Sequence, residues 1–440
     1  MQSALSNEAR LRIEYRAIGS LKPYPGNARK HPKSQIRKIA KSQRQFGWTN
    51  PILIDAEGTV LCGHGRLEAA QLNGDREVPV ISLEHLGEAD RKAYIIADNR
   101  IAEEAQWSKA ALHRELSGLA ELGYELEMTG FDNLEIDTIL SMDDDPIEED
   151  QVELPEENAR PVSRLGDLWE VGPHRLLVGD ARDPAAYEAL LQGERAELIV
   201  TDPPYGCVIE NNVSGGGKKK HGNFVMGAGE TSLPEFAANL LHPTFQRIAE
   251  NAAPGAIAFV FIDWRGAPYL HQAAEGVFQE TKNLIVWAKT NGGQGAFYRS
   301  AHELIYAFKV NAGKHINNFG LSGRYRTNVW GYPGANTFRP GRMEDLADHP
   351  TVKPKKMIAD AILDCSKHGG VVLDPFLGAG TTLCAAEAVG RIGRGIELDP
   401  IYVDVSVRRL AKACKATPML DGRSFDEVAH ERLSTESNNG

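Results

Sequence analysis

The chain has 440 residues, 42% of them hydrophobic, and a formal net charge of −11, so its length predicts two or three domains rather than one core. Its five cysteines are odd in number, scattered and without Cys-x-x-Cys spacing, which argues against a disulfide framework and a metal site. No apolar run approaches the roughly 20 residues of a membrane helix. The first residues also lack the basic and apolar regions of a signal peptide, so we expect no membrane contact and a cytoplasmic location.

The first unit is predicted to span residues 1–105. Residues 51–55 are typical of a strand, and residues 58–62 of its hairpin partner. A turn over residues 63–66 then leads into a helix that continues to Leu72.

An amphipathic helix is expected upstream, because Ile36, Ile39 and Ala40 recur at helical spacing after Ser34, the predicted N-cap. Residues 21–44 carry eight Lys or Arg and no acid. A solvated helix face is the simpler interpretation of this run, and contact with nucleic acid is the alternative.

Three motifs of this unit resemble the N-terminal nuclease-like domain of ParB partition proteins, which is related in shape to sulfiredoxin. They are Asn50-Pro51-Ile-Leu-Ile, Gly63-x-x-Arg66-x-x-Ala69 and Ala97-Asp98-Asn99-Arg100. The resemblance implies a small α+β domain in which Gly63 and Arg66 bind nucleotide phosphates. The third nucleotide box of the partition proteins has no clear match after Arg100, so we expect a docking or DNA-contacting module rather than nucleotide hydrolysis.

Residues 106–160 are predicted to form a helix followed by an acidic linker. The leucines at positions 112, 116, 119 and 122 indicate the helix. Residues 143–157 hold nine acids and no Lys or Arg, and subtracting them from the net charge of −11 leaves −2 for the rest of the chain. Such a self-repelling stretch is typical of a flexible linker, and basic patches elsewhere can still bind phosphates.

The second half centres on Asp202-Pro203-Pro204-Tyr205, which follows a short apolar run at residues 198–200. The run predicts a buried parallel strand, and the prolines must turn the chain at its carboxyl end, where open α/β sheets bind ligands. A carboxylate, proline carbonyls and an aromatic ring together can hold a planar group that carries an amino group. The simpler alternative is a turn aspartate followed by a rigid loop.

Two irregular segments are candidates for DNA contact. Residues 215–221 form a Gly-rich basic loop with Lys218, Lys219 and Lys220, for which a merely solvated loop is the alternative. Residues 311–348 are rich in Asn, Gly and Arg, including Arg324 and Arg326. Arginine and asparagine suit base edges in the major groove, so this segment is the predicted target-recognition region.

A second strand and turn follow at residues 371–382. The strand ends at Asp374, the Gly378-x-Gly380 turn lets backbone approach a ligand, and a helix begins next to it. Another short strand ends at Glu397, an acid at the spacing that commonly binds ribose hydroxyls. These features predict a nucleoside cofactor site.

Asp202-Pro203-Pro204-Tyr205 upstream of Asp374-Pro-Phe376-x-Gly378-x-Gly380-Thr381-Thr382 resembles the β class of amino-directed DNA methyltransferases, which use S-adenosylmethionine. Gly179-Asp180, Pro254-Gly255 and the stretch from His349 to Pro354 also match, so the resemblance covers residues 161–415. It implies an α/β, Rossmann-like methyltransferase fold with a mostly parallel sheet, and adjacent strand ends for the two main motifs. Residues 416–440 are expected to be a tail.

The resemblance also implies roles for individual residues. A base flipped out of double-stranded DNA would enter the Asp202 to Tyr205 turn, with Tyr298 and Arg299 in the loop beside it and no metal involved. Residues 167–180 would form a small antiparallel hairpin that delivers Asp180 to the cofactor. The implied cofactor-binding residues are Asp180, Thr351, Lys353, Pro354, Asp374, Phe376, Gly378, Gly380, Thr381 and Glu397.

The expected reaction is methylation of the N6 amine of adenine, because Asp rather than Ser at position 202 is more similar to the adenine enzymes. Cytosine N4 methylation is the alternative within the class. An alternative of another class is a ParB-like DNA-binding or nuclease factor with a vestigial methylase. The family suggests a solitary or phage-type modification enzyme, related to those of restriction-modification systems. Whether the protein forms a homodimer stays open.

Overall fold

The computed structural model describes residues 11–105, 107–140, 147, 160–205, 232–289, 298–319, 326–334 and 353–437. The chain divides into two compact units, residues 1–142 and 143–440, and each is described by itself. Several predicted contacts lie outside the described residues, namely Lys218, Lys219, Lys220, Arg324 and Thr351.

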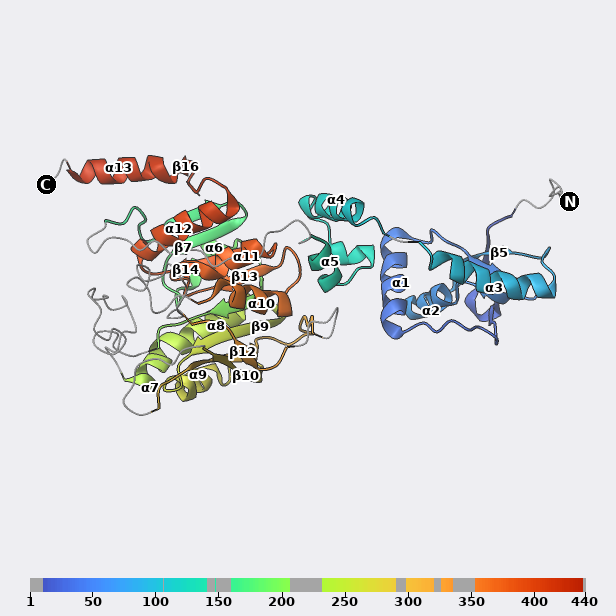
Figure 1. Ribbon diagram of the computed structural model, residues 1–440, viewed down its shortest axis with the longest axis horizontal. Helices are drawn as coiled ribbons and strands as arrows, with labels where there is room; N and C mark the ends of the chain where they lie inside the picture. The colour runs from blue at the N-terminus through green and yellow to red at the C-terminus, as the bar shows by residue number, and fades with distance from the viewer. Residues whose placement is uncertain are drawn as a thin grey trace. The chain divides into compact units, whose positions relative to one another are not determined.

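The first unit starts with a five-stranded sheet in the order β1-β5-β3-β4-β2. After the sheet and the helices α1 to α3, three helical segments, α4, η2 and α5, complete the unit (Figure 1). Its elements are β1 Glu14–Ala17, η1 Ile18–Ser20, β2 Lys22–Pro23, α1 Lys33–Phe46, β3 Ile52–Ile54, β4 Thr59–Cys62, α2 His64–Asn73, β5 Glu77–Ser82, α3 Glu88–Ala102, α4 Lys109–Glu121, η2 Leu126–Thr129 and α5 Asn133–Leu140.

The sheet of this unit confirms the predicted hairpin, because β3 and β4 pair antiparallel. Its core joins both strands to β5 and α2, with Ile52, Val60, Val80 and Leu67 among the buried side chains. The predicted N-cap of α1 is wrong. The helix begins at Lys33, and Pro32 is its N-cap with φ −67° and ψ 149°, values that suit the fixed φ of proline.

Helices α4 and α5 share a separate small core with η2. Leu116, Leu126, Ile136 and Ile139 are buried in it. The leucine pattern predicted α4 but not η2 or α5. Gly123 follows α4 and Gly130 follows η2, and both have positive φ, which glycine adopts without strain.

The second unit is built on an eleven-stranded sheet in the order β12-β10-β11-β9-β8-β13-β14-β7-β6-β15-β16. Its elements are β6 Leu168–Val171, β7 His174–Val178, α6 Pro184–Leu191, β8 Ala196–Thr201, α7 Leu233–Phe236, the π-helical turn η4 Ala237–Leu241, α8 His242–Asn251, β9 Ala252–Ile262, α9 Ala267–Ala274, β10 Glu280–Ala288, β11 His302–Lys309, β12 Val329–Gly331, α10 Lys355–Cys365, β13 Val371–Asp374, α11 Thr381–Ala388, β14 Ile392–Glu397, α12 Pro400–Cys414, β15 Met419–Leu420, β16 Arg423–Ser424 and α13 Phe425–Ser437.

The predicted fold class is confirmed, with a mixed sheet. The five central strands β9, β8, β13, β14 and β7 are parallel. Antiparallel strands flank them on both sides, including β11 against β9 and the predicted β6–β7 hairpin. Parallel neighbours must be joined by a long crossover, because a short turn can join only antiparallel strands. Long connections follow each of these five strands.

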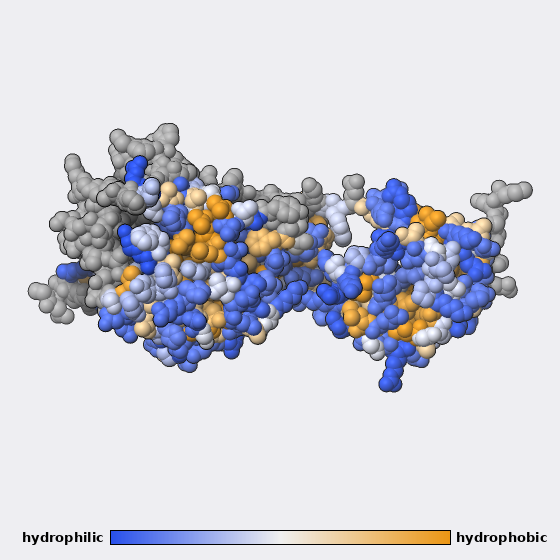
Figure 2. All heavy atoms as spheres, turned by 90° about the horizontal axis from the view of Figure 1, so that it is seen from below, coloured by the Kyte–Doolittle hydropathy of each residue, from blue (hydrophilic) through white to orange (hydrophobic). Residues whose placement is uncertain are grey.

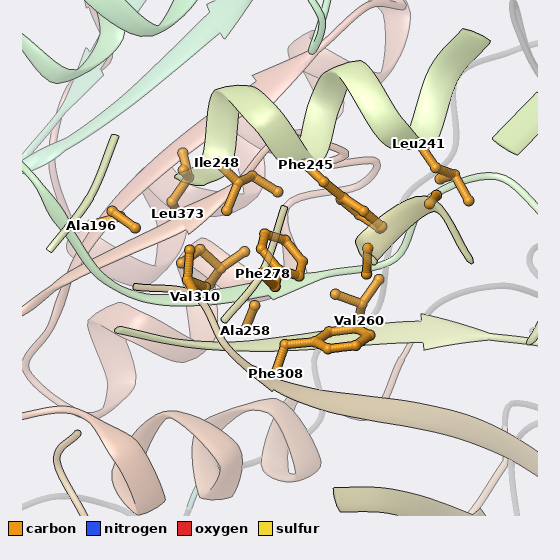
Figure 3. Close-up of a cluster of buried hydrophobic side chains, with 14 of the residues drawn as sticks. Ala196, Leu241, Phe245, Ile248, Ala258, Val260, Phe278, Phe308, Val310 and Leu373 are labelled. Carbon is orange, nitrogen blue, oxygen red and sulfur yellow. The ribbon is translucent and has the colours of Figure 1, made fainter. Parts of the chain in front are cut away.

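Helices cover both faces of this sheet (Figure 1). On one face, Phe245 and Ile248 of α8 pack against Ala258 and Val260 of β9, with Phe308 of β11 alongside (Figure 3). On the other face, α10 and α11 cover the alternate residues of β8 and β9. Each fully buried Phe or Ile adds about 1.5–3 kcal/mol, so the core holds the strand ends of the parallel centre in place.

The predicted tail over residues 416–440 is wrong in its described part, which contains β15, β16 and α13. Leu420, Phe425 and Val428 are buried with Trp169 of β6, so apolar side chains fix this segment to the sheet. Asp167 accepts hydrogen bonds from Arg432 of α13 as well.

Among the described residues, no helix combines the length and the hydrophobicity needed to cross a membrane. Figure 2 shows one face, on which hydrophilic residues dominate the described surface and apolar residues gather in smaller areas.

Candidate active site at the carboxyl ends of the central strands

The two main sequence motifs meet at one edge of the sheet. Strands β8 and β13 pair in parallel, with Leu198 opposite Val372 and Ile199 opposite Leu373. At their carboxyl ends, the Thr201 hydroxyl donates a hydrogen bond of 2.7 Å to Asp374. The predicted adjacency of the two strand ends is therefore confirmed.

Asp202 lies in a cluster of charged side chains just beyond β8. Its Oδ1 accepts a hydrogen bond of 2.7 Å from the Tyr205 hydroxyl, and its Oδ2 accepts one of 2.6 Å from Lys353 Nζ. Lys353 Nζ also lies 3.1 Å from Glu303 Oε2, and the Tyr205 hydroxyl lies 3.1 Å from the same atom. Lys289 forms a further ion pair with Glu303. Two carboxylates and two ammonium groups thus alternate in the order Asp202, Lys353, Glu303, Lys289, and the Tyr205 hydroxyl contacts the first three.

The electrostatics of this cluster follow from burial and from the alternating charges. Burial raises the pKa of Asp202, the Glu303 charge adds to this, and the Lys353 ammonium opposes it. Burial also disfavours the charged form of Glu303, but Lys353 and Lys289 outweigh it and lower the pKa of Glu303 to about 2. Burial lowers the pKa of Lys353, yet the two carboxylates overcome this and raise it. Glu303 is therefore an anion that holds both lysines.

Sequence reasoning singled out neither Glu303 nor Lys289 as a site residue. The two residues lie at the facing ends of β11 and β10, which pair antiparallel. A charged residue at the start of the otherwise apolar run Leu304-Ile-Tyr-Ala-Phe308 was the signal that could have found Glu303.

The glycine loop after β13 has the geometry that its sequence predicts. Gly378 and Gly380 have φ of 53° and 83°, which glycine adopts without strain. A Cβ on Gly380 would lie 2.9 Å from Ser406 Oγ, whereas a Cβ on Gly378 would meet no atom within 4 Å. The loop therefore packs against α12 at one glycine and leaves open space at the other.

Asp374, at the end of β13, stabilises this loop through hydrogen bonds. It is only 3% exposed, and its carboxylate accepts hydrogen bonds from the hydroxyls of Thr201 and Thr382 and from the Phe376 backbone N–H. Burial raises its pKa to about 6, although the hydroxyl and backbone bonds favour the charged form. On the far side of the loop, Arg409 donates to the Ala379 carbonyl and to Thr381.

Two more acids lie at neighbouring strand ends. Glu397, at the end of β14, accepts hydrogen bonds from Gly378 N–H at 2.8 Å and from Asp399 N–H at 2.9 Å. Burial raises its pKa to about 7, because it outweighs these two backbone bonds. Asp180 follows β7 and is paired with Arg182 at 2.6 Å, which lowers its pKa. Carboxylates thus follow four adjacent strands, β7, β14, β13 and β8.

Two of the predicted cofactor residues, Lys353 and Pro354, lie at the start of α10 rather than in the glycine loop. Pro354 is the N-cap of α10, and Lys353 directly before it extends to Asp202 and Glu303. Lys353 thus belongs to the Asp202 cluster, whereas the family resemblance implied that it binds the cofactor.

The predicted DNA-contact residues divide into two groups. Tyr298 is 88% exposed and Arg299 is also exposed, close to Ser300 and the start of β11. Arg326 instead turns inward. Its guanidinium forms an ion pair of 3.0 Å with the fully buried Asp364 and lies 4.3 Å from the Trp330 ring centre. Because its charge is used inside the protein, Arg326 does not fit the predicted contact with a base edge.

In the first unit, Gly63 and Arg66 flank the start of α2. Gly63 has φ of 101°, and Arg66 Nη1 donates a hydrogen bond of 2.8 Å to the Pro51 carbonyl. The Tyr24 N–H donates to His64 Nε2 at 3.2 Å. These bonds fix the turn within the domain.

His174, Glu387 and Cys414 place possible metal ligands within 4.8 Å of one another. However, the Gly393 N–H donates to His174 Nδ1 at 2.8 Å, so the ring proton lies on Nε2, which donates to Glu387 at 2.9 Å. A metal would need the Nε2 lone pair, and the cluster is better explained as a hydrogen-bonded structural group.

Comparison with known proteins covers both units. Residues 196–408 match the family model described as DNA methylase, for N6 and N4 methyltransferases, and residues 110–165 match the ParB-methyltransferase HTH domain. The ParB-like nuclease domain-containing protein YnaK of Escherichia coli K12 is 43% identical over 83 residues, which are 19% of this chain and 95% of that protein. The type II methyltransferase M.HpaI of Haemophilus parainfluenzae is 24% identical over 251 residues, or 53% of this chain and 74% of that one.

Two solved structures are also similar. The M1.HpyAVI–SAM complex is 22% identical, covers 53% of this chain and 98% of its own, and has a TM-score of 0.39. PvuII DNA methyltransferase, a cytosine-N4-specific enzyme, is 15% identical, covers 62% and 93%, and has a TM-score of 0.41.

The family match, together with the paired motifs at the sheet edge, defines a DNA methyltransferase of the N6/N4 class, whose methyl donor is S-adenosylmethionine. The chain belongs to the ParB-like nuclease domain-containing proteins and joins that domain to the methylase. The predicted combination of a ParB-like domain with an amino-directed DNA methylase is confirmed.

Proposed function

We propose that this protein is a site-specific DNA methyltransferase that methylates the N6 amine of an adenine flipped out of duplex DNA. The observation that carries the proposal is the junction of β8 and β13, where Thr201 joins the Asp202 turn to Asp374 of the glycine loop. In this proposal, the Asp202 turn accepts the amino group, and the glycine loop beside it binds the nucleoside. Cytosine N4 is the second candidate, because the matched family includes both amines.

The residues around the glycine loop fit S-adenosylmethionine. The open space at Gly378 lets a ligand approach the backbone, and the Glu397 carboxylate lies at 2.8 Å from that glycine's N–H. In this proposal Glu397 accepts hydrogen bonds from the ribose hydroxyls, Phe376 contacts the adenine, and Asp180 lies at the next strand end. When bound, S-adenosylmethionine supplies an electrophilic methyl group on a sulfonium.

The Asp202 turn would hold the target amine. Both oxygens of Asp202 are already hydrogen-bonded, one by the Tyr205 hydroxyl and one by Lys353 Nζ. Each carboxylate oxygen has two lone pairs, so Asp202 can accept a hydrogen from the incoming amine beside these donors, and Glu303 also holds Lys353 in place. The Asp202 carboxylate and the Pro203 carbonyl then accept the two amine hydrogens, which makes the nitrogen lone pair available to attack.

Asp202 would also accept the proton that the amine loses after methyl transfer. A base works best when its pKa is near the working pH, and burial moves the pKa of Asp202 upward in that direction. Alignment and preorganised charge supply most of the remaining acceleration.

The proposed DNA contacts follow from exposure. Flipping a base costs a few kcal/mol of stacking, and an exposed ring such as Tyr298 can offset part of that cost.

The domain limits 1–105, 106–160 and 161–415 stay part of the proposal. The ParB-like unit is proposed as a docking module, with Gly63 and Arg66 as its candidate phosphate contacts.

Incubation with tritiated S-adenosylmethionine and unmethylated duplex DNA, followed by digestion to nucleosides, is expected to give labelled N6-methyl-2′-deoxyadenosine. Labelled N4-methyl-2′-deoxycytidine would instead support the second candidate. Absence of label in DNA would contradict the proposed function, and labelled protein or RNA would identify another substrate.

The affinity for S-adenosylmethionine is expected to depend on pH through Glu397. Its raised pKa of about 7 means that lowering the pH protonates the carboxylate in the free protein, and a carboxylate accepts hydroxyl hydrogen bonds more strongly than a neutral acid. Affinity should therefore fall roughly fourfold from pH 8 to pH 6.5. This window stays above the pKa of Asp374, about 6.

Titration calorimetry at several pH values checks this prediction. Glu397→Gln should bind more weakly and lose the pH dependence. A flat profile for the unaltered protein, or an unchanged slope in the variant, would exclude Glu397 as the titrating group.

A further inference from the structure

Helix α1 of the ParB-like unit is strongly basic. Its 14 residues include Lys33, Arg37, Lys38, Lys41 and Arg44 and no acid. Lys38 donates a hydrogen bond to the Gly130 carbonyl, and Lys41 forms an ion pair with Glu125, so these two hold α1 to the η2 segment.

The other three cations have no such partner. Lys33, Arg37 and Arg44 are exposed, and in the described part of the chain none of them contacts a carboxylate. Their positions, separated by four and seven residues, lie within about 40° of one another around the helix. They therefore form a straight row, about 16 Å long, along one flank of α1.

This row is held rigidly. Ile36 and Ala40 on another side of α1 are buried and pack with Ala69 of α2. The Asn73 side chain donates to the Ala40 carbonyl, and the Gln43 side chain donates to the Arg66 carbonyl. Rigid spacing matters because each strand of a duplex carries one phosphate per about 3.4 Å of helix axis, so a fixed row can face more than one of them.

Helix α5 of the helix-turn-helix segment does not offer an equivalent surface. Helix α5 contains no Lys or Arg, and Leu134, Ile136, Asp137 and Ile139 are buried. Its remaining acid, Glu135, accepts from the Asp132 N–H. An acidic, buried helix cannot enter a groove lined by phosphates.

We propose that the α1 flank, defined by Lys33, Arg37 and Arg44, binds the phosphate backbone of duplex DNA and holds the substrate on the protein. The inference rests on the proposed function for the identity of the partner. Contacts of this kind position DNA without reading its sequence. The α1 flank therefore raises the affinity for any duplex, and base selection is left to the methylase unit.

The test compares two triple variants of the full chain. The first is Lys33→Gln, Arg37→Gln and Arg44→Gln. The control is Arg16→Gln, Lys92→Gln and Lys282→Gln, which removes the same charge from residues already paired with Glu14, Glu88 and Glu280. Equal thermal unfolding midpoints establish that both variants fold.

Binding to a duplex without a methylation site is measured by fluorescence anisotropy over a range of salt concentrations. The α1 variant should lose on the order of tenfold or more in affinity, and the slope of log affinity against log salt should fall by about 2.7, or roughly 0.9 per cation. With a methylatable duplex, KM for DNA should rise while kcat stays unchanged. The control should behave like the unaltered protein.

Equal losses in both variants, or an unchanged slope in the α1 variant, would overturn the inference. Loss of binding to an acidic peptide with DNA binding intact would also overturn it. The proposed function fails separately: a protein that binds duplex DNA through α1 but transfers no methyl group would retain this inference and lose the other.

Discussion

Asp202→Asn is expected to lower methyl transfer to DNA by roughly 10³-fold while S-adenosylmethionine binds as before. The amide keeps the size of the side chain but loses the charge that accepts the amine hydrogens and the released proton. It also leaves the Lys353 ammonium without its partner at 2.6 Å. Single-turnover transfer of tritiated methyl groups measures the rate, and calorimetry measures cofactor binding.

Tyr205→Phe is the matched control for this prediction. It removes the hydroxyl that donates to Asp202 Oδ1 and keeps the ring, so a smaller loss, on the order of tenfold, is expected. Full transfer by Asp202→Asn would reject the assigned role, and equal losses of transfer and cofactor binding would indicate a general defect of the fold.

Glu303→Gln should have the second largest effect. Glu303 is the anion that holds Lys289 and Lys353, and its loss leaves two ammonium groups with Asp202 as the remaining carboxylate of the cluster. Breaking a buried ion pair costs about 3 kcal/mol or more of stability. Methyl transfer should fall roughly 10²-fold, because Lys353 then pairs with Asp202 alone in this cluster and competes with the amine for that carboxylate.

A double-mutant cycle with Lys353→Met separates positioning from simple destabilisation. If Glu303 acts through Lys353, the effects of the two changes on kcat should be non-additive by about 1–3 kcal/mol. Additive effects on kcat, or a loss of activity that follows unfolding alone, would show that Glu303 is only structural. Denaturant unfolding of the same variants supplies the stability comparison.

The parts of the site that sequence could predict are local. The apolar run before Asp202 defined a strand, the prolines defined its end, and Gly378 and Gly380 defined a turn that only glycine adopts without strain. Each conclusion depends on a few neighbouring residues. The adjacency of the two strand ends came instead from the resemblance to amino-directed DNA methyltransferases, and the pairing of β8 with β13 confirms it.

What sequence could not predict depends on partners that are distant along the chain. Lys353 approaches Asp202 across 151 positions, and Glu303 approaches Tyr205 across 98. Arg326 has the composition of a DNA-contacting residue, but the buried Asp364 of α10 turns it inward. A charged residue in a sequence is compatible with many roles. The packing of α10 near β8, and the position of β11 beyond β9 in the sheet, select one of them.

The hydrogen bond between Thr201 and Asp374 has an evolutionary consequence. The two residues are 173 positions apart, so the whole intervening polypeptide leaves and returns to one fixed junction. Loops within that excursion can be lengthened or replaced without moving the junction, provided that its strands and the residues Asp202, Glu303 and Lys353 are kept. Under the proposed function, new sequence preferences can arise in such loops without any change in the chemistry.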